Sequence, residues 1–373
     1  MVIVAGEASA DLHGSHLVKA MKSLDPHVVF WGIGGERMEK AGVRILIPSS
    51  DMAVVGLTEV LFHLRTIAKA RGKLKSVLKN NHPDLLILID YPDFNIHIAG
   101  IAKRFHVPVL YYISPQVWAW RRGRVKKISR RIDRMAVILP FEREFYRRHG
   151  LKVDFVGHPL LDANPAKVDK KKVREKLGLD QAYPVVGLLP GSRKEEIINL
   201  LPVMIDAAKI MGRSYNSIRF FLQLAPNIKR EFVQSFIKDT SVEIKIFQGD
   251  IYEVLSICDM VLVASGTATL ETAIMEVPMI IAYKVSPISY WTAQRVVKVP
   301  HIGLVNLVAG EEAVPELIQA EVIPERLAHE ALTILESDRV RENMIIKLRG
   351  VKKSLGKRGA SKTTAKIAFE MMR

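Results

Sequence analysis

The feature that most constrains the fold is the alternation of short, continuous apolar runs with longer segments of helical periodicity. Because the runs are apolar at every position, both faces of these strands must be covered, as in a parallel sheet flanked by helices. The intervening segments are long enough for crossover helices, so we predict a succession of βαβ units. The predicted strands are residues 3–5, 28–31, 85–89, 107–112, 135–139, 153–156, 185–189, 218–222, 242–247, 260–264 and 279–282.

This rhythm is interrupted once, between residues 158 and 184, by Pro159, Pro165 and a basic run over 167–172. We therefore predict an α/β protein with two doubly wound Rossmann-like domains that face each other across a cleft, with ligands at the carboxyl ends of the strands. The predicted divisions are a first domain over 1–163, a linker over 164–184, a second domain over 185–350 and a basic terminal helix over 351–373. Whether that helix returns to the first domain stays open.

Composition excludes several classes of protein. Of the 373 residues, 49% are hydrophobic and 25% are charged, which excludes a disordered chain. No uninterrupted apolar run approaches the ~18–20 residues that cross a bilayer. The amino terminus lacks the pattern of a signal peptide, and the single cysteine, Cys258, excludes an internal disulfide. We therefore expect a cytoplasmic protein.

The net charge of +16 is concentrated in two segments. Residues 121–134 hold eight Lys or Arg and one Asp, and residues 347–373 hold nine Lys or Arg and one Glu. Such segments attract phosphate, either of nucleic acid or of an anionic bilayer. The alternative is a solvated helix face, which usually mixes basic and acidic residues. A solvated face is therefore less favoured than a phosphate-binding segment for 121–134, and the two interpretations are equally favoured for 347–373.

A glycine turn, Gly6, follows the first predicted strand and leads through residues 7–11 into a helix, which is an anion-binding geometry. A carboxylate at Glu7 would repel phosphate, so a sugar hydroxyl is the better partner for it. For Ser9 and Asp11, plain helix capping is equally consistent.

Asp90 ends a run of five apolar residues and so lies at the carboxyl tip of a central strand. A carboxylate at the edge of an apolar sheet can have a raised pKa, which suits a general base that takes a proton from a hydroxyl. Asp93 and Asn95 follow at the start of the next helix, where capping is the favoured interpretation for Asp93. Asp-x-x-Asp without further ligands is a poor site for magnesium or calcium.

Two loops in the second half each join a strand to a helix. The first contains Gly191, Ser192 and Arg193, and Ser192 with Glu195 reads as a capping box. Arg193 beside the helix N-terminus would clamp a diphosphate. The second loop contains the set Ser265, Gly266 and Thr267, and Glu271 lies one turn later, where it could accept hydrogen bonds from ribose hydroxyls. Together these loops favour a nucleotide-diphosphate site over simple capping.

Aromatic and apolar residues accompany the first basic segment. Trp118 and Trp120 precede Arg121, Arg122 and Arg124, and could stack on bases, lie at a lipid–water boundary or pack in the core. Upstream, residues 52–64 carry few charges, so they fit a helix in a membrane interface or a buried helix equally well. The candidate membrane contacts there are Met52, Val55, Leu57, Leu61 and Phe62.

Several common sites are missing from the sequence. The dinucleotide fingerprint fails because Arg37 stands where its third glycine is required, and no P-loop or Gly-x-Ser-x-Gly motif is present. His13 and His16 form a close pair without a third ligand, which is a weak zinc candidate. We therefore expect no metal and no cofactor.

Taken together, these motifs resemble the lipid-A-disaccharide synthase family over essentially the whole chain. The resemblance rests on residues 6–9, 90–95, 112–121, 139–142, 156–159, 188–193, 264–268 with Glu271, and 306–310. Ala10 and Val305 depart from the family pattern, where glycine and proline are usual.

The resemblance implies an inverting glycosyltransferase of the GT-B type at the cytoplasmic face of the inner membrane. Its donor would be UDP-2,3-diacylglucosamine and its acceptor 2,3-diacylglucosamine 1-phosphate, joined by a β-1,6 bond with release of UDP. It implies that Asp90 is the base, that Glu7 lies in the active site, and that Arg193, Glu271 and Asn306 surround the nucleotide sugar. The first domain would then face the acceptor and an anionic membrane surface, and no nucleic acid would be a partner.

Two other interpretations compete. A nucleic-acid-binding protein would explain the basic segments and tryptophans but not Arg193, Glu271 and the paired glycine loops. A soluble UDP-sugar epimerase on the same fold would explain the nucleotide loops. The run over residues 118–121 and the apolar helix argue against it.

Overall fold

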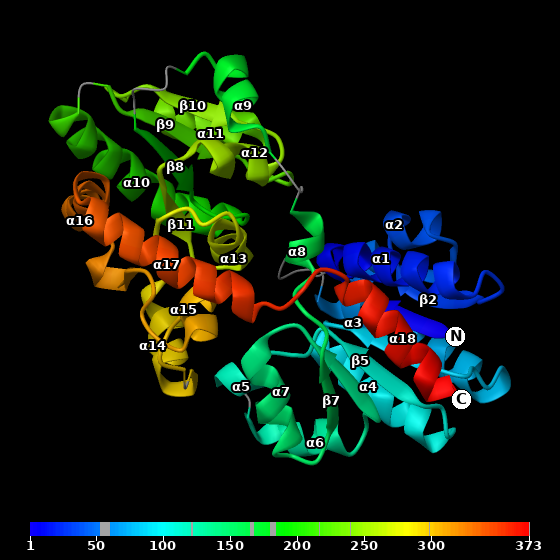
Figure 1. Ribbon diagram of the computed structural model, residues 1–373. Coiled ribbons are helices and arrows are strands. Elements are labelled where there is room, and N and C mark those ends of the chain that lie inside the picture. Colours follow the sequence, from blue (N-terminus) through cyan, green and yellow to red (C-terminus); the bar gives the residue numbers. More distant parts are fainter. Residues whose placement is uncertain are drawn as a thin grey trace. The chain divides into compact units, whose positions relative to one another are not determined.

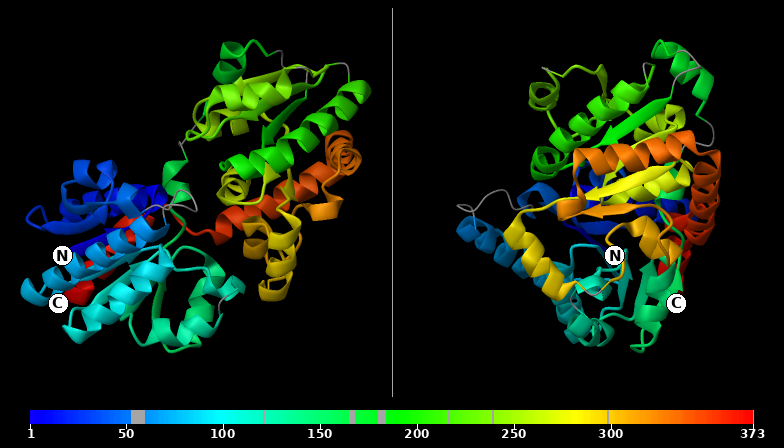
Figure 2. Two further views of the ribbon diagram at one scale, coloured as in Figure 1. Left: turned by 180° about the vertical axis from the view of Figure 1, so that it is seen from behind. Right: turned by 90° about the vertical axis from the view of Figure 1, so that its left-hand side faces the viewer.

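The computed structural model describes residues 1–52, 60–120, 122–164, 168–179, 184–215, 217–238, 240–297 and 299–372. The chain forms two compact units, Met1–Asp162 with Gly356–Arg373, and Ala163–Leu355. Each unit contains one parallel sheet covered by helices on both faces, as Figures 1 and 2 show. The predicted α/β class with two doubly wound sheets is confirmed.

The sheet of the first unit has seven strands in the order β3-β2-β1-β4-β5-β6-β7. The chain builds outward from β1 in one direction and then from β4 in the other, so a topological switch point lies between these two strands. The strands are β1 (Val2–Ala5), β2 (Phe30–Gly34), β3 (Val43–Pro48), β4 (Leu86–Ile89), β5 (Val109–Tyr112), β6 (Arg134–Val137) and β7 (Lys152–Phe155).

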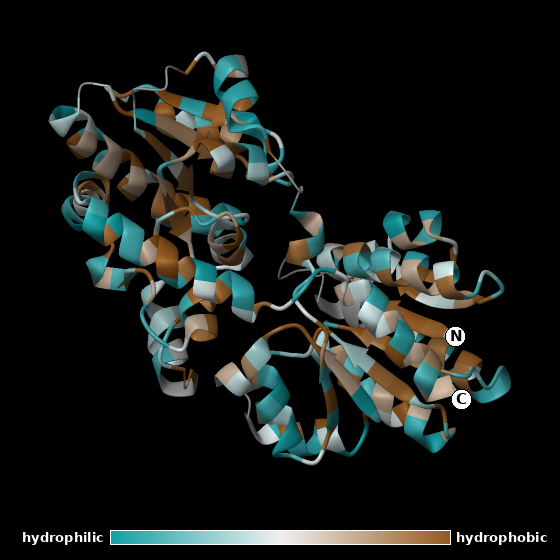
Figure 3. Ribbon diagram, in the orientation of Figure 1, coloured by the Kyte–Doolittle hydropathy of each residue, from teal (hydrophilic) through white to brown (hydrophobic). Residues whose placement is uncertain are grey.

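Two hydrophobic clusters hold this sheet between its helices. Alternate residues of β1 and β4 enter opposite clusters: Val2 and Leu86 face one cluster, whereas Ile3 and Ile87 face the other. Figure 3 shows the strands as the most hydrophobic elements. The helices of this unit are α1 (Ala8–Leu24), α2 (Glu36–Lys40), α3 (Val60–Asn80), α4 (Pro92–Arg104), α5 (Val117–Trp120), α6 (Val125–Ser129), α7 (Pro140–Arg147) and α18 (Ala360–Met372).

The sheet of the second unit has six strands in the order β10-β9-β8-β11-β12-β13, with its own switch point between β8 and β11. Its strands are β8 (Val185–Leu189), β9 (Arg219–Gln223), β10 (Ile244–Phe247), β11 (Met260–Ala264), β12 (Met279–Tyr283) and β13 (Glu316–Ile318). Its helices are α9 (Lys170–Lys176), α10 (Lys194–Ser214), α11 (Arg230–Ile237), α12 (Ile251–Ile257), α13 (Thr267–Ile274), α14 (Pro287–Val296), α15 (Leu304–Ala309), α16 (Pro324–Glu336) and α17 (Asp338–Ser354).

The boundary between the units differs in detail from the divisions expected from the sequence. Helix α8 (Leu160–Ala163) spans the division, and α9, which lies in the segment treated as a linker, packs against α12 of the second unit. Helix α18 packs against α1 of the first unit (Figure 1). The Gly359 amide donates to the Asp162 carboxylate at 2.6 Å, which fixes the start of α18.

The basic segment over residues 347–373 is divided between the two units. In α17, Arg349 and Lys352 both pair with Glu276, at 2.7 and 2.8 Å, and Lys347 pairs with Glu311 at 3.5 Å. Helix α18 belongs to the other unit. Three of the nine cations of this segment are thus paired within the second unit, and the segment is not a single tail.

Candidate active site

The Asp90 carboxylate and the Glu7 loop are neighbours because their strands pair. Ala5 of β1 is in register with Ile89 of β4, so both following residues emerge at the carboxyl edge of the first sheet. Asp90 and Tyr91 have φ values of +46° and +48°. Two successive non-glycine residues in the left-handed region are strained, and such strain concentrates at functional sites.

Hydrogen bonds from two side chains hold the Asp90 backbone in this conformation. The Tyr111 hydroxyl donates to the Asp90 carbonyl oxygen at 2.6 Å, and the Asn95 amide donates to the same oxygen at 2.7 Å. The Asn95 amide also donates to the Ile89 carbonyl oxygen at 3.2 Å. Asn95 is fully buried, so it acts as an internal support of the turn.

The Asp90 side chain is chemically suited to accept a proton. Burial raises its pKa to about 6, and the negative charge of Glu7 contributes in the same direction. A carboxylate with this pKa is mostly ionised at neutral pH, yet it is a stronger base than an ordinary aspartate. The role of Asp90 as a general base stays a prediction, and this raised pKa is what that role requires.

The loop after β1 requires glycine because an aromatic ring occupies the space beside it. A Cβ atom on Gly6 would lie 2.5 Å from the Tyr91 ring. The Tyr91 hydroxyl donates to the Met52 carbonyl oxygen at 3.1 Å. Glu7 is the N-cap residue of α1, but its exposed side chain makes no capping hydrogen bond, which leaves the carboxylate available to a ligand.

Asp11 has a structural role, but it does not cap its own helix. Its carboxylate accepts from the Gly35 amide at 2.6 Å and from the Met38 amide at 3.1 Å. Asp11 therefore caps α2, which begins after Gly35. The sequence could not indicate this partner because it lies 24 residues away.

Trp118 was a candidate for the acceptor or membrane surface, and the structure corrects this. It is 5% exposed, its ring stacks edge-on against Phe141 at 4.8 Å, and its indole N–H donates to Glu142 at 3.0 Å. The buried Glu142 carboxylate also accepts from the Ser114 hydroxyl at 2.6 Å and the Leu139 amide at 3.1 Å. Burial raises the pKa of Glu142 to about 7. Helix α7 thus fixes the loop after β5 through a buried carboxylate.

The remaining acceptor and membrane candidates divide into three groups. Met52 is fully buried, so it is a core residue and not a surface contact. Trp120 is 45% exposed, and Arg124 forms an ion pair with Asp93. The structure does not describe the side chains of the other candidates, which are Val55, Leu57, Leu61, Phe62, Arg121 and Arg122.

The second unit carries a pocket of about 580 Å³ at the carboxyl ends of its strands. The predicted nucleotide residues that line it are Gly191, Ser192, Arg193, Ser265, Gly266, Thr267 and Glu271. The pocket is also lined by Gln223, Pro226 and Asp250, which were not among the predicted nucleotide residues. A signal was present, because these residues closely follow the predicted strands 218–222 and 242–247, whose carboxyl ends meet at the same edge.

The capping of α10 differs from the prediction by one residue. Arg193 is the N-cap residue, and Glu196 instead of Glu195 accepts from the Ser192 and Arg193 amides at 2.9 and 3.1 Å. Gly191 has φ of +112°, and a Cβ there would lie 2.3 Å from the Glu196 carboxylate. These amides are already used, so an anion would depend on the Arg193 guanidinium.

The second loop offers an N-terminus that no side chain caps. Gly266 is the N-cap residue of α13 and has no side chain to cap it. The Thr269 amide donates to the Gly266 carbonyl oxygen at 3.2 Å, so the Thr267 and Ala268 N–H groups remain for an anion. Within this helix, burial raises the pKa of Glu271 to about 7, with a contribution from Asp250. An ionised Glu271 can accept hydrogen bonds from vicinal hydroxyls of a ribose.

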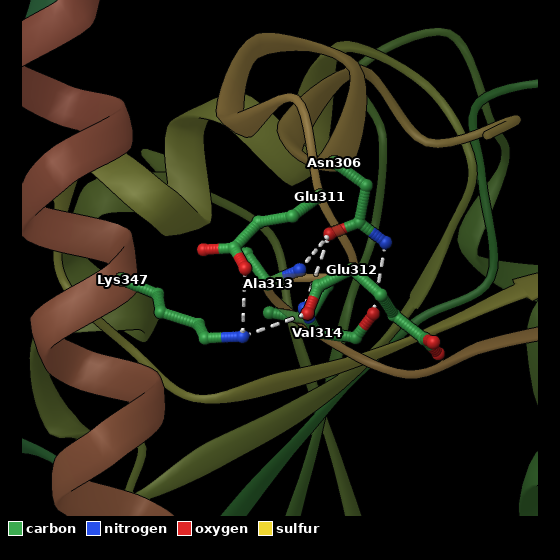
Figure 4. Close-up of polar contacts among 6 residues, drawn as sticks. All are labelled: Asn306, Glu311, Glu312, Ala313, Val314 and Lys347. Carbon is green, nitrogen blue, oxygen red and sulfur yellow. Dashed lines mark hydrogen bonds and ion pairs between the residues drawn. The ribbon is translucent and has the colours of Figure 1, made fainter. Parts of the chain in front are cut away.

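Asn306 does not belong to this pocket. It is fully buried, its amide oxygen accepts from the Ala313 and Val314 amides, and its amide nitrogen donates to the Val314 carbonyl at 2.8 Å and to Glu316 at 2.7 Å. Figure 4 shows the Asn306 amide turned toward this loop, beside the pair of Lys347 with Glu311. Its hydrogen-bonding capacity is used internally, so Asn306 shapes a loop and does not contact a nucleotide sugar in this arrangement.

The described part of the chain contains neither a cluster of metal ligands nor a membrane-spanning helix. No group of three or more His, Cys, Asp or Glu residues there has the geometry to hold a metal ion. No helix among the described residues is long and apolar enough to span a membrane.

Comparisons with known proteins extend these observations. A family model described as lipid-A-disaccharide synthetase matches residues 1–369. The lipid-A-disaccharide synthase of Geobacter metallireducens is 49% identical over 372 residues, covering 100% of this chain and 97% of that protein.

Solved structures resemble the chain at much lower identity. The UDP-GlcNAc 2-epimerase from Neisseria meningitidis, bound to UDP-GlcNAc, aligns with a TM-score of 0.63 at 12% identity, covering 99% of this chain and 98% of that one. MurG from Acinetobacter baumannii aligns with a TM-score of 0.61 at 14% identity, covering 99% of each chain. Structural similarity at 12% and 14% sequence identity shows a shared fold alone.

Proposed function

The chain belongs to the lipid-A-disaccharide synthase family, and from this premise we propose how its residues divide the work of a glycosyl transfer. The protein is a glycosyltransferase. Its proposed donor is UDP-2,3-diacylglucosamine and its proposed acceptor is 2,3-diacylglucosamine 1-phosphate. The products are the β-1,6-linked disaccharide 1-phosphate and UDP.

Asp90 supplies the base in this proposal. Its carboxylate takes the proton of the acceptor 6-hydroxyl while the oxygen attacks the anomeric carbon of the donor. The bond between that carbon and the diphosphate oxygen breaks, and UDP leaves with the bonding electron pair. A single in-line displacement inverts the anomeric centre and needs no enzyme nucleophile. Glu7 positions the acceptor through a hydroxyl and keeps the pKa of Asp90 raised.

The second unit binds the donor and stabilises the leaving group. Glu271 accepts from the ribose hydroxyls, and the diphosphate lies against Arg193 and the uncapped N-terminus of α13. Positive charge and oriented N–H groups stabilise the negative charge that develops on UDP. The observation that carries the proposal is the half-buried Asp90 carboxylate, with its pKa raised to about 6, at the switch point of the first sheet.

The direct test is turnover. The purified protein is incubated with both acylated substrates, and disaccharide and UDP are measured together. Equal amounts of the two products are expected. Release of UDP without disaccharide, or neither product, would contradict the proposed reaction.

We also propose that the protein works at the cytoplasmic face of the inner membrane. Each buried acyl methylene contributes about 0.8 kcal/mol, so multiply acylated substrates remain in the bilayer. The exposed Trp120, the segment over 53–64 and the cationic set Arg121, Arg122 and Arg124 are the proposed contacts.

Replacing Arg121, Arg122 and Arg124 by alanine should weaken binding to anionic vesicles by about 100-fold, at about 1 kcal/mol for each charge. Vesicle cosedimentation measures this, with zwitterionic vesicles as the control. Unchanged binding to anionic vesicles would refute the assignment.

A further inference from the structure

A second cavity of about 500 Å³ adjoins the nucleotide pocket within the same unit. The two cavities share four lining residues, which are Arg193, Glu196, Ala264 and Ser265. The charged residues that line the second cavity are two cations and two carboxylates, namely Arg193, Lys284, Glu195 and Glu196. The proposed function gives a task to Arg193 alone, so Lys284 is a cation beside the diphosphate site that has no role yet.

The charge of Arg193 is already partly balanced. Its guanidinium lies 3.7 Å from the Glu196 carboxylate, which also accepts from the Ser192 and Arg193 amides. This pair therefore adds little net positive charge to the site. The uncapped N-terminus of α13 contributes about half an elementary charge. Glu195 is exposed, so water weakens its interaction with a ligand. A diphosphate at this site thus needs a further cation.

The sheet places Lys284 where that cation is needed. Lys284 directly follows β12, which pairs with β11 on the side opposite to β8. Strand β8 leads to Arg193, and β11 leads to the N-terminus of α13. Because the three strands are parallel and adjacent, Arg193, the first turn of α13 and Lys284 emerge in a row along one edge of the sheet.

The loop that carries Lys284 is fixed on the far side of the cavity. The Val285 amide donates to the Gln319 side-chain oxygen at 2.7 Å, and the Gln319 side-chain nitrogen donates to the Val285 carbonyl oxygen at 3.0 Å. One side chain thus satisfies both backbone groups of Val285. Lys284 itself is half-buried, and none of the ion pairs among the described residues involves it. Its ammonium group is therefore free to contact a ligand.

We propose that Lys284 is a catalytic residue whose ammonium contacts the diphosphate of the donor at the phosphate farther from uridine. Lys284 lines only the second cavity, whereas Arg193 lines both, so Lys284 lies beyond Arg193 as seen from the nucleotide pocket. The inference rests on the proposed function and adds to it a residue for the departure of UDP.

The contact should strengthen as the reaction proceeds. When the bond between the anomeric carbon and the diphosphate oxygen breaks, the electron pair stays on that oxygen, and UDP leaves with more negative charge than the diphosphate carried in the donor. Lys284 transfers no proton in this step. An interaction that grows with the developing charge lowers the barrier, so its loss should reduce kcat as well as UDP affinity.

The test compares UDP with UMP, which lacks the phosphate proposed to contact Lys284. The Kd of each nucleotide is measured by calorimetry, and kcat is measured as disaccharide formation, in the wild type, Lys284→Met and Lys284→Arg. Lys238→Met is the matched control, because it removes an exposed lysine that follows α11 in the same unit. Binding of UMP also reports whether the nucleotide pocket of each variant is folded.

For Lys284→Met we expect the Kd for UDP to rise about tenfold, the Kd for UMP to stay unchanged and kcat to fall about 100-fold. Lys284→Arg keeps the charge and should retain most of both properties, and Lys238→Met should change neither. An unchanged kcat in Lys284→Met, or an equal loss of affinity for UDP and UMP, would overturn the inference. Failure of the wild-type protein to bind UDP or to form disaccharide would instead overturn the proposed function.

Discussion

The two units place opposite charges at equivalent positions of one topology. In the first sheet the switch point between β1 and β4 is followed by two carboxylates, Glu7 and Asp90. In the second sheet the switch point between β8 and β11 is followed by Arg193 and the uncapped N-terminus of α13. The fold determines where a ligand binds, whereas in the proposed function the loop residues determine which part of the reaction each unit performs.

The largest effect is expected from removing the base. Asp90→Asn keeps the size of the side chain but cannot accept the proton, so kcat should fall by about 10²–10⁴-fold. UDP affinity should not change, because the proposed nucleotide pocket lies in the second unit. Steady-state turnover and UDP calorimetry separate the two outcomes. Turnover close to that of the wild type would remove Asp90 from the role of base.

Removing the Arg193 guanidinium from the pocket of the second unit should have a smaller effect, and the effect should be on UDP binding. Arg193→Ala should weaken UDP binding by about 10-fold to 100-fold, because a charge-assisted contact to the diphosphate is lost. Arg213→Ala, at the exposed far end of the same helix, is the matched control. If both variants bind UDP equally well, Arg193 does not hold the diphosphate.

The next test disturbs a buried support of the first unit. Glu142→Gln replaces one carboxylate oxygen by an NH₂ group, which cannot accept a hydrogen bond from the Ser114, Trp118 or Leu139 donors. The free energy of unfolding should therefore fall by about 1–3 kcal/mol. Urea denaturation measures this. Glu144→Gln on the same helix changes an exposed carboxylate and should leave stability unchanged. Equal stability of the two variants would show that the Glu142 network contributes nothing.

The smallest expected effects are two pH dependences, one for each unit. The pKa of Asp90 is raised to about 6 and the base must be ionised, so kcat/KM should fall as the pH falls through 6. The pKa of Glu271 is raised to about 7 and its ionised form accepts the ribose hydroxyls, so UDP affinity should fall by a few-fold as the pH falls through 7.

Glu271→Gln should remove the second dependence and keep the first. Calorimetry of UDP binding and turnover, each measured from pH 5 to 8.5, test this. If kcat/KM and UDP affinity changed with the same pH midpoint, the assignment of the first to Asp90 and of the second to Glu271 would be contradicted.

The sequence was most informative where strands are buried on both sides. Strands such as β4 and β11 are fully buried and apolar throughout, and all eleven predicted strands are present. The two missed strands, β3 and β13, are at sheet edges. Edge strands are partly solvated, so they carry residues such as Arg44 and Glu316, and continuous hydrophobicity no longer identifies them.

The site was predictable to the extent that it depends on strand ends. Asp90 directly follows the apolar run 85–89, and Arg193 comes shortly after the run 185–189. Both residues were therefore placed correctly at the carboxyl edge of their sheets. The errors concern residues whose partners are distant in sequence. Trp118 and Asn306 have polar groups that a ligand could use, but Glu142 and the 313–316 loop use them first. Such competition becomes visible only when the chain is folded.

The return of α18 to the first unit has a consequence for how the protein folds. Residues 163–355 are contiguous, so every contact of the second unit forms within one uninterrupted segment. The first unit completes its core only when α18, including the buried Ala365 and Ala368, docks on a segment from which the whole second unit separates it in sequence. Closing so long a loop costs conformational entropy, so the unit that carries Asp90 should be the slower of the two to complete its packing.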